Sequence, residues 1–315
     1  MDKSIIERVD SATHIDSSRL MSPPSFPKSL KIEVTSRCNF NCSYCGVSRK
    51  LRKTGDMDWF FYADLIQDAV KLNVKEVGLF LLGEPFLRDD LSSMVKYAKD
   101  AGIEYVFITT NGSLCTKTNL ESCASAGLDS LKFSINAPRV GYESTHGVQS
   151  STYDYVIEKI KWLYHYKIQN NLTLPRTCVS SIYIQELKEE LAGMEADIKP
   201  FVDEFYYLPM YSQAGYSSIA CKTVGNIGRF ENPVPPVPCW GLFNSAKITW
   251  DGWLTACCFD HTGHFKIADL NTTSLLDAWN DYKFIELRQE HLDNHINDPV
   301  CRTCLGIKED EINNV

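Results

Sequence analysis

Three cysteines, Cys38, Cys42 and Cys45, lie in a CxxxCxxC spacing directly after an apolar stretch at residues 30–34. Three thiolates in one short loop suit an iron-sulfur cluster in which the fourth iron stays open to another ligand. A structural zinc site needs four ligands in a closed tetrahedron, and the next cysteine, Cys115, lies far along the chain. The spacing therefore favours a cluster with an open coordination position. One alternative is a zinc site, and another is that the three cysteines have no common ligand.

This loop, with Tyr44 before its last cysteine, resembles the CxxxCx(aromatic)C motif of the radical S-adenosylmethionine (SAM) superfamily. In that family SAM chelates the open iron of a 4Fe-4S cluster, and an electron from the cluster cleaves SAM to a 5′-deoxyadenosyl radical. The resemblance implies that Cys38, Cys42 and Cys45 hold this cluster and that Tyr44 packs near the adenine.

The segment Leu82-Gly83-Glu84-Pro85 follows a second apolar stretch and resembles the GGEP motif of the same family, with Leu82 in place of its first glycine. The resemblance implies that this segment binds SAM. Gly83 then allows a close approach of the backbone, and Glu84 accepts a hydrogen bond from the SAM ammonium.

Polar residues also follow the next two apolar stretches. Asn111 lies in a Thr-Asn-Gly sequence that the family often has, and Ser134 and Asn136 match positions near the SAM ribose, where the family frequently has Ser and Asp. The resemblance implies that all three bind SAM. Asn is also common in turns after strands, which is the alternative for Asn111 and Asn136.

The periodicity of apolar residues predicts the elements that position these groups. Strands and helices alternate, which predicts a parallel sheet with right-handed crossovers, and ligands bind beyond the carboxyl ends of such strands. About six units fit, matching the partial (β/α)6 barrel that the resemblance implies, an α/β fold. The predicted strands are 30–34, 77–82, 105–109, 130–135, part of 172–184, and 205–208, and the predicted helices lie around 62–70, 91–98, 156–163 and 186–198.

A second set of cysteines follows a stretch rich in Gly, Ser and Pro. The sequence predicts a hairpin over 247–257 that turns at Asp251-Gly252, and then a helix from about residue 274 to residue 290. Two cysteine pairs in this arrangement suit a second cluster or a zinc ribbon. The cysteines of this segment are Cys239, Cys257, Cys258, Cys301 and Cys304, and the last two form a CxxC pair.

This segment resembles the SPASM/Twitch domain of radical SAM enzymes in its first cysteine, its Gly-x4-Cys hairpin and its final CxxC. The full SPASM pattern has seven cysteines and two auxiliary clusters, whereas this segment has five. The resemblance therefore implies one auxiliary 4Fe-4S cluster, held by Cys239, Cys257, Cys301 and Cys304.

Cys258 is the fifth cysteine of the segment. Alternation along the hairpin predicts that Cys257 and Cys258 point to opposite faces. Cys258 is then a packed apolar residue, a ligand that exchanges with Cys257, or a catalytic hydrogen-atom donor in the active site.

Other candidates have weaker patterns. Arg139, Glu204, Tyr206 and Tyr207 could face a substrate or be structural. His261 and His264 have the residue type of metal ligands, but a solvated turn is the preferred interpretation. Cys115, Cys123, Cys178 and Cys221 show no ligand spacing.

The whole chain has 315 residues, a net charge of −8 and no basic tract, so neither nucleic acid nor an anionic membrane is an expected partner. No apolar run is long enough to span a membrane, and residues 1–19 lack the apolar core of a signal peptide. Twelve cysteines indicate metal binding and not disulfides. Together these features predict a cytoplasmic location. The predicted organisation is an N-terminal arm over the barrel at 1–28, the barrel at 29–210, a linker at 211–238 and the auxiliary-cluster domain at 239–315.

These expectations describe an enzyme that abstracts a hydrogen atom from a substrate carbon, with SAM, two 4Fe-4S clusters and a reductant such as flavodoxin or ferredoxin. Residues 1–28 leave no room for the extra peptide-recognition domain of many relatives, which favours oxidation or epimerisation of a carbohydrate-like or other small molecule. The alternative is a maturase that cross-links or epimerises a ribosomally made peptide. A non-catalytic iron-sulfur or zinc protein is the third possibility.

Overall fold

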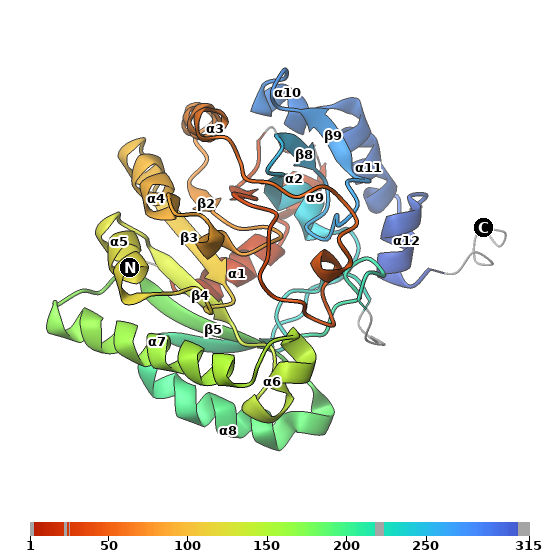
Figure 1. The fold of residues 1–315 in the computed structure, drawn as a ribbon. Coiled ribbons are helices and arrows are strands. Elements are labelled where there is room, and N and C mark those ends of the chain that lie inside the picture. The colour runs from red at the N-terminus through yellow and green to blue at the C-terminus, as the bar shows by residue number, and fades with distance from the viewer. Residues whose placement is uncertain (1–2, 22–23, 25, 218–223, 308–315) are drawn as a thin grey trace.

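The computed structural model describes residues 3–21, 24, 26–217 and 224–307 (Figure 1). Within these residues, nine strands form one sheet in the order β6-β5-β4-β3-β2-β1-β7-β8-β9. The first six strands in the chain pair in parallel, each with the next, as the barrel prediction requires. They are β1 (Ser29–Ile32), β2 (Glu76–Gly78), β3 (Tyr105–Thr110), β4 (Ser130–Ser134), β5 (Arg176–Ile182) and β6 (Glu204–Leu208).

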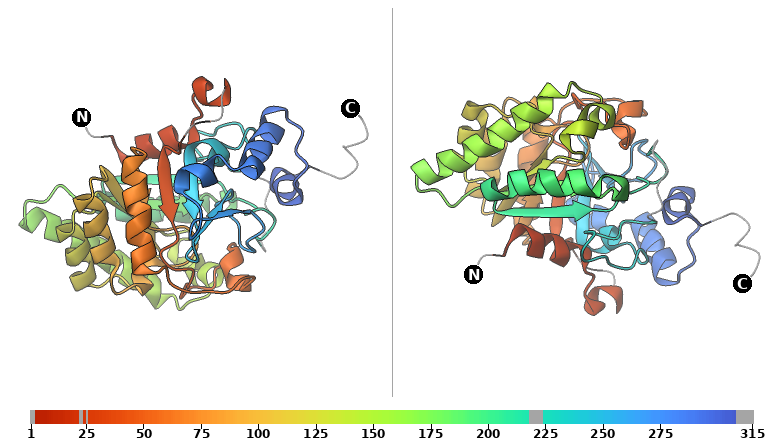
Figure 2. Two further views of the ribbon diagram at one scale, coloured as in Figure 1. Left: turned by 90° about the horizontal axis from the view of Figure 1, so that it is seen from above. Right: turned by 90° about the horizontal axis from the view of Figure 1, so that it is seen from below.

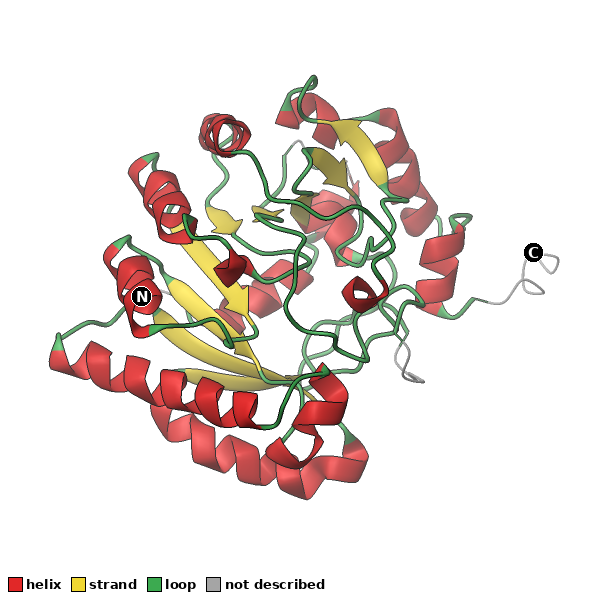
Figure 3. Ribbon diagram, in the orientation of Figure 1, coloured by secondary structure: helices red, strands yellow, loops and turns green. Residues whose placement is uncertain are grey.

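Helices cover the outer face of these strands (Figures 1 and 3). In α3, Asp58 caps the first turn by accepting hydrogen bonds from two backbone N–H groups, and buried side chains recur every three to four residues. The covering helices are α3 (Trp59–Lys71), α4 (Leu91–Asp100), α5 (Lys117–Ser125), α7 (Ser151–Gln169) and α8 (Lys188–Ile198), and the short α6 (Arg139–His146) precedes α7.

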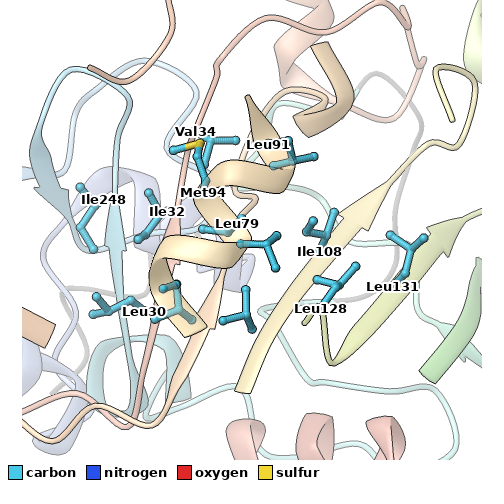
Figure 4. Close-up of a cluster of buried hydrophobic side chains, with 14 of the residues drawn as sticks. Leu30, Ile32, Val34, Leu79, Leu91, Met94, Ile108, Leu128, Leu131 and Ile248 are labelled. Atoms are coloured by element: carbon cyan, nitrogen blue, oxygen red, sulfur yellow. The ribbon is translucent and has the colours of Figure 1, made fainter. Parts of the chain in front are cut away.

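Alternate residues of the strands point to opposite sides of the sheet. Leu30, Ile108 and Leu131 point outward and form a core with Leu91 and Met94 of α4 (Figure 4). Burial of each such side chain contributes about 1.5–3 kcal/mol. The inward-pointing residues between them line a cavity and include Ser29, Lys31, Tyr105, Phe107, Ser130, Lys132, Ser134, Tyr206 and Leu208.

The N-terminal segment closes the amino end of the barrel. The first residues of three strands hold α1 (Ile5–Thr13) there: Glu204 accepts hydrogen bonds of 2.7 and 2.6 Å from Ile5 N and Ile6 N, Glu76 pairs with Arg8, and the Tyr105 ring lies under the Arg8 guanidinium. A second helix, α2 (Ser17–Met21), follows. The carboxyl end of the barrel remains for the predicted site.

The C-terminal segment continues the barrel sheet. Strand β7 (Ser245–Ile248) pairs in parallel with β1 over four residues, and β8 (Trp253–Thr255) pairs with β7 as the predicted hairpin, which turns at Gly252 with φ +88°. Figure 2 shows this blue segment on the β1 side of the barrel. Its other elements are α9 (Trp240–Asn244), β9 (Lys266–Asp269), α10 (Leu275–Trp279), α11 (Tyr282–Leu292) and α12 (Pro299–Leu305).

The prediction of one helix over 274–290 is wrong. The Asp281 side chain accepts a hydrogen bond from Lys283 N and starts a new helix, so α10 and α11 are separate. The strand predicted over 77–82 is also shorter, because β2 ends at Gly78. No helix in the described ranges has the length and apolar content of a membrane span.

Candidate active site

A cavity of about 420 Å³ extends along the inner face of the strands, from α1 at their amino ends to the cysteine loop at their carboxyl ends. Every residue predicted to bind SAM or its cluster lines this cavity, except Pro85. The residues brought together are Cys38, Cys42, Cys45, Tyr44, Gly83, Glu84, Asn111, Ser134 and Asn136, and Cys258 joins them from the C-terminal segment.

The end of α6 holds the cysteine loop in place. Asn41 N and Ser43 N donate hydrogen bonds to the carbonyls of His146 and Thr145, at 3.1 and 2.9 Å. Gly147 has φ +65°, and a Cβ there would come within 2.7 Å of Asn41 O, so this contact requires glycine. The loop is therefore shaped by backbone contacts with a distant helix.

The three thiols of the loop fit an iron-sulfur cluster. They line one side of the cavity, and burial raises the pKa of Cys38 to about 11 and that of Cys42 to about 12. The thiols are therefore protonated without metal, and cluster binding must release their protons. Thiolate donors in this number suit a 4Fe-4S cluster with one open iron.

Glu84 ties the strand ends together. Its carboxylate accepts hydrogen bonds from Thr110 Oγ1 at 2.6 Å, Asn111 N at 2.7 Å and Phe86 N at 3.1 Å. Burial raises its pKa to about 6, although these hydrogen bonds act in the opposite direction. A carboxylate placed in this way can bind the ammonium group of SAM.

The backbone conformation and close packing at Gly83 require a glycine, which the motif alone did not indicate. Its φ is +92°, and a Cβ there would lie 2.5 Å from Thr35 O. Glu84 N also donates to Arg37 O at 2.8 Å. The loop after β2 is thus packed directly against the loop after β1.

Two asparagines connect the strand ends to the cysteine loop. Asn111 Nδ2 donates to Asn39 Oδ1 at 3.0 Å, and Asn136 Nδ2 donates to the Tyr44 hydroxyl at 2.6 Å. These contacts go beyond the general preference of Asn for turns. Both residues help to place the loop that carries the cysteines.

A second, smaller pocket of about 50 Å³ lies in the C-terminal segment. Its lining includes Cys239, Cys257, Cys301 and Cys304, the four predicted ligands, together with the buried Lys247. Burial raises the pKa of Cys304 to about 12 and also raises that of Cys239. These four thiols fit an auxiliary 4Fe-4S cluster, just as Cys38, Cys42 and Cys45 fit the SAM-binding cluster.

Helix α12 orients the CxxC pair. Asp298 caps the helix by accepting hydrogen bonds from Val300 N at 2.8 Å and Cys301 N at 2.9 Å. Residues three apart lie on the same helix face, so Cys301 and Cys304 both line the pocket.

Cys257 and Cys258 do not point to opposite faces, so that prediction is wrong. Strand β8 ends at Thr255, and both thiols line the smaller pocket. A hydrogen bond from Cys257, with the charges of Lys31 and Lys247, lowers the pKa of Cys258. Cys258 also lines the main cavity, so it lies between the two predicted cluster sites.

The remaining candidates for substrate contact fall into one residue that lines the cavity and three that have structural partners elsewhere. Tyr206 lines the cavity, whereas Tyr207 donates to Leu191 O outside it and Arg139 pairs with Asp154 at the surface. Glu204 holds α1, as described above, and is structural.

The histidines and the other cysteines have structural surroundings. His261 is buried 3.0 Å from Gln213 Oε1, so the solvated-turn interpretation is wrong for it, while the more exposed His264 pairs with Asp298. Cys115, Cys123 and Cys178 are buried in the fold, and Cys221 lies outside the described residues.

Sequence reasoning missed two inward-pointing lysines, Lys31 of β1 and Lys132 of β4, which line the cavity with Phe80 and Trp240. Both interrupt apolar strand sequences, at Leu30-Lys31-Ile32 and Leu131-Lys132-Phe133. A cationic residue inside an otherwise apolar strand was the available signal.

Comparison with known families agrees with this geometry. The radical SAM superfamily model matches residues 32–190, half of the chain, and the model of SPASM, an iron-sulfur cluster-binding domain, matches residues 239–305. The chain therefore belongs to the radical SAM superfamily and carries a C-terminal SPASM domain. The predicted fold class, SAM and 4Fe-4S clusters are confirmed.

Among curated proteins, the chain is 25% identical over 311 residues to the tungsten-containing aldehyde ferredoxin oxidoreductase cofactor-modifying protein of Pyrococcus furiosus, with 83% of each covered. It is 33% identical over 133 residues to PqqA peptide cyclase of Gluconobacter oxydans, an alignment that spans 42% of this chain and 37% of the cyclase.

Two solved structures share the fold. Streptococcus suis SuiB bound to precursor peptide SuiA matches with a TM-score of 0.66 at 17% identity, covering 83% of this chain and 66% of SuiB. BtrN in complex with AdoMet and 2-DOIA matches with a TM-score of 0.62 at 18% identity, covering 90% of this chain and 95% of BtrN.

Proposed function

We propose that this protein uses radical SAM chemistry to modify a peptide, joining two of its atoms or inverting a residue after hydrogen-atom abstraction. One observation carries the proposal. A single cavity is lined by Cys38, Cys42 and Cys45 and also by Cys258, which contacts Cys257 in the second cysteine pocket. A substrate in this cavity lies between the two cysteine sets.

Bound SAM and its cluster supply the 5′-deoxyadenosyl radical that removes one hydrogen atom from the substrate. The residues of the chain would position the reactants: Glu84 would accept a hydrogen bond from the SAM ammonium, and Tyr44, held by Asn136, would pack near the adenine. The aromatic lining from Phe80, Phe107 and other rings excludes water from the reacting carbon.

Bond formation in the peptide requires loss of a second electron and a proton after the first hydrogen atom. The second cysteine set lies next to the cavity at Cys258 and is the place for the electron acceptor. Inversion of a residue instead requires return of a hydrogen atom. Cys258 is the candidate donor in its thiol form, which its lowered pKa makes less populated than that of an ordinary cysteine.

The relatives support a peptide over the small molecule first expected. The sequence is similar to PqqA peptide cyclase over 133 residues, and the fold resembles that of SuiB, whose structure contains its precursor peptide SuiA. A small-molecule oxidation is the second candidate. It is favoured by the match to BtrN in complex with 2-DOIA, which covers 95% of that chain.

The test uses anaerobically reconstituted protein with dithionite, SAM and short peptides encoded next to its gene. A modified peptide formed together with 5′-deoxyadenosine supports the proposal: a cross-link removes two hydrogen atoms, and inversion in D2O incorporates deuterium. The Cys38→Ala/Cys42→Ala/Cys45→Ala variant is the control and should form neither product. If 5′-deoxyadenosine formation responds to amino sugars or cyclitols while every peptide stays unmodified, the second candidate replaces the first.

A further inference from the structure

Two lysines flank one aromatic ring inside the main cavity. The Nζ atoms of Lys31 and Lys132 lie 5.9 and 6.0 Å from the centroid of the Phe80 ring. Lys31 also lies 5.2 Å from the Trp240 ring, and Lys132 Nζ lies 3.3 Å from the Tyr206 hydroxyl. Aromatic faces therefore hold both cations toward the cavity.

Neither ammonium group forms an ion pair with a carboxylate in the described ranges. Lys167 shows the contrast, because it is also buried and pairs with Asp203 at 2.9 Å. Burial lowers the pKa of both cavity lysines, that of Lys132 to about 8, while the nearby thiols of Cys258 and Cys178 act in the opposite direction on Lys31 and Lys132. Two cations in a site of low dielectric are costly unless an anion joins them.

The lysines lie deeper than the groups that face SAM. Lys132 precedes Ser134 by two residues along β4, a distance of about 6.6 Å. Lys31 lies within β1, before the loop that carries the cysteines. The anion that they would bind therefore belongs to a second molecule, on the side of the cavity away from the cysteine loop.

We propose that Lys31 and Lys132 bind a carboxylate of the substrate, and that Phe80 and Trp240 pack against the carbon atoms next to it. The inference rests on the proposed function in one respect: if the substrate is a peptide, the carboxylate is an acidic side chain or the C-terminus. The lysines then determine substrate specificity, because they hold an acidic group of the substrate on the side of the reacting carbon that faces away from the cysteine loop.

Binding is measured by anaerobic calorimetry on the cluster-reconstituted, SAM-loaded protein. The probes are N-acetylglutamate α-amide against N-acetylglutamine amide, N-acetylglycine against N-acetylglycinamide, and inorganic phosphate. We expect one acid to bind at least about tenfold more tightly than its amide, as for a charge-assisted hydrogen bond. The acid that does so identifies the side chain or the C-terminus as the source. Equal binding of acids and amides, or tighter binding of phosphate, overturns the proposal.

Variants connect the effect to the two lysines. Lys31→Met and Lys132→Met should each remove most of the preference for the acid, and the Arg variants should keep part of it. Lys117→Met is the matched control, because Lys117 lies over the Trp162 ring but is exposed and outside the cavity. Iron content and SAM affinity are measured for each variant. A fall in SAM affinity equal to the fall in acid affinity overturns the proposal.

This experiment separates the two proposals. Preference for the acid is a binding result, so it stands even if no peptide is modified. Conversely, peptide modification without any preference for the acid sustains the proposed function and removes the carboxylate site.

Discussion

Asn136 Nδ2 donates a hydrogen bond of 2.6 Å to the hydroxyl of Tyr44, which joins the end of β4 to the cysteine loop 92 residues earlier in the chain. The Tyr44 ring also packs edge-on against His146 of α6. The aromatic residue of the motif is thus held by two elements that its own sequence neighbourhood does not contain.

Removing this hydrogen bond should weaken SAM binding. In Asn136→Leu the loop loses one contact of about 1 kcal/mol, so we expect an affinity lower by about fivefold, measured by anaerobic equilibrium dialysis. Tyr44→Phe keeps the ring but removes this bond and also the hydrogen bond between the Tyr44 hydroxyl and the Cys42 side chain, so its loss should be at least as large. A loss confined to Asn136→Leu would show that Asn136 contacts SAM itself.

SAM binding should depend on the ionisation of Glu84. Burial raises its pKa to about 6, and the ionised form binds the SAM ammonium, so the affinity should begin to decrease about one pH unit above 6 and continue to fall below it. Glu84→Gln should bind SAM at least about tenfold more weakly at pH 8 and show no such decrease. Dissociation constants measured from pH 5.5 to pH 8 test this. A wild-type profile that stays flat to pH 5.5 contradicts it.

Acid should destabilise the fold through His146. Burial lowers its pKa to about 4, below the ordinary value of 6.5, so the unfolded state binds a proton first as the pH decreases. Its contribution to stability is complete above pH 6.5 and is lost as the pH falls toward 4. Between pH 8 and pH 5.5 the loss is about 1.4 kcal/mol.

Guanidinium unfolding of the reconstituted protein measures this loss. His146→Gln should lose about 1.4 kcal/mol less than the wild type over the same pH range. His14→Gln, a change at an exposed histidine, is the control and should follow the wild type. Identical pH dependence in all three proteins would assign the acid sensitivity to other groups.

Iron content distinguishes the roles of Cys257 and Cys258. With two 4Fe-4S clusters the wild type should hold about eight irons, Cys257→Ala about four, and Cys258→Ala about eight. The reverse pattern makes Cys258 the ligand. If Cys258→Ala also keeps full turnover on a peptide that is inverted, Cys258 is not the hydrogen-atom donor.

The barrel and the group of motif residues that line its cavity were predictable because their signals are local. Apolar runs mark the strands, and the motifs follow them in the chain, so the placement of Glu84 in the loop after β2 needs no tertiary information. Pairing of β1 with β7 was not predictable, because these strands are more than 200 residues apart and each could have formed a sheet edge.

The error at Cys258 has a similar cause. Asp260 accepts hydrogen bonds from Thr255 Oγ1, Gly263 N and His264 N. These contacts turn the chain directly after Thr255, so alternation along a strand no longer applies to Cys257 and Cys258. Lys31 and Lys132 were missed because their inward direction depends on strand register, which the sequence does not show at single-residue resolution.

Because β7 pairs with β1, the domain boundary predicted near residue 239 does not separate two independent sheets. Leu30 has Val77 as its register partner on one side and Ala246 on the other, so a barrel cut in the preceding linker would expose the whole edge of β1. An uncovered edge strand invites pairing with other chains. The two segments thus share one sheet, and an exchange of C-terminal segments between relatives must also supply a strand that fits β1.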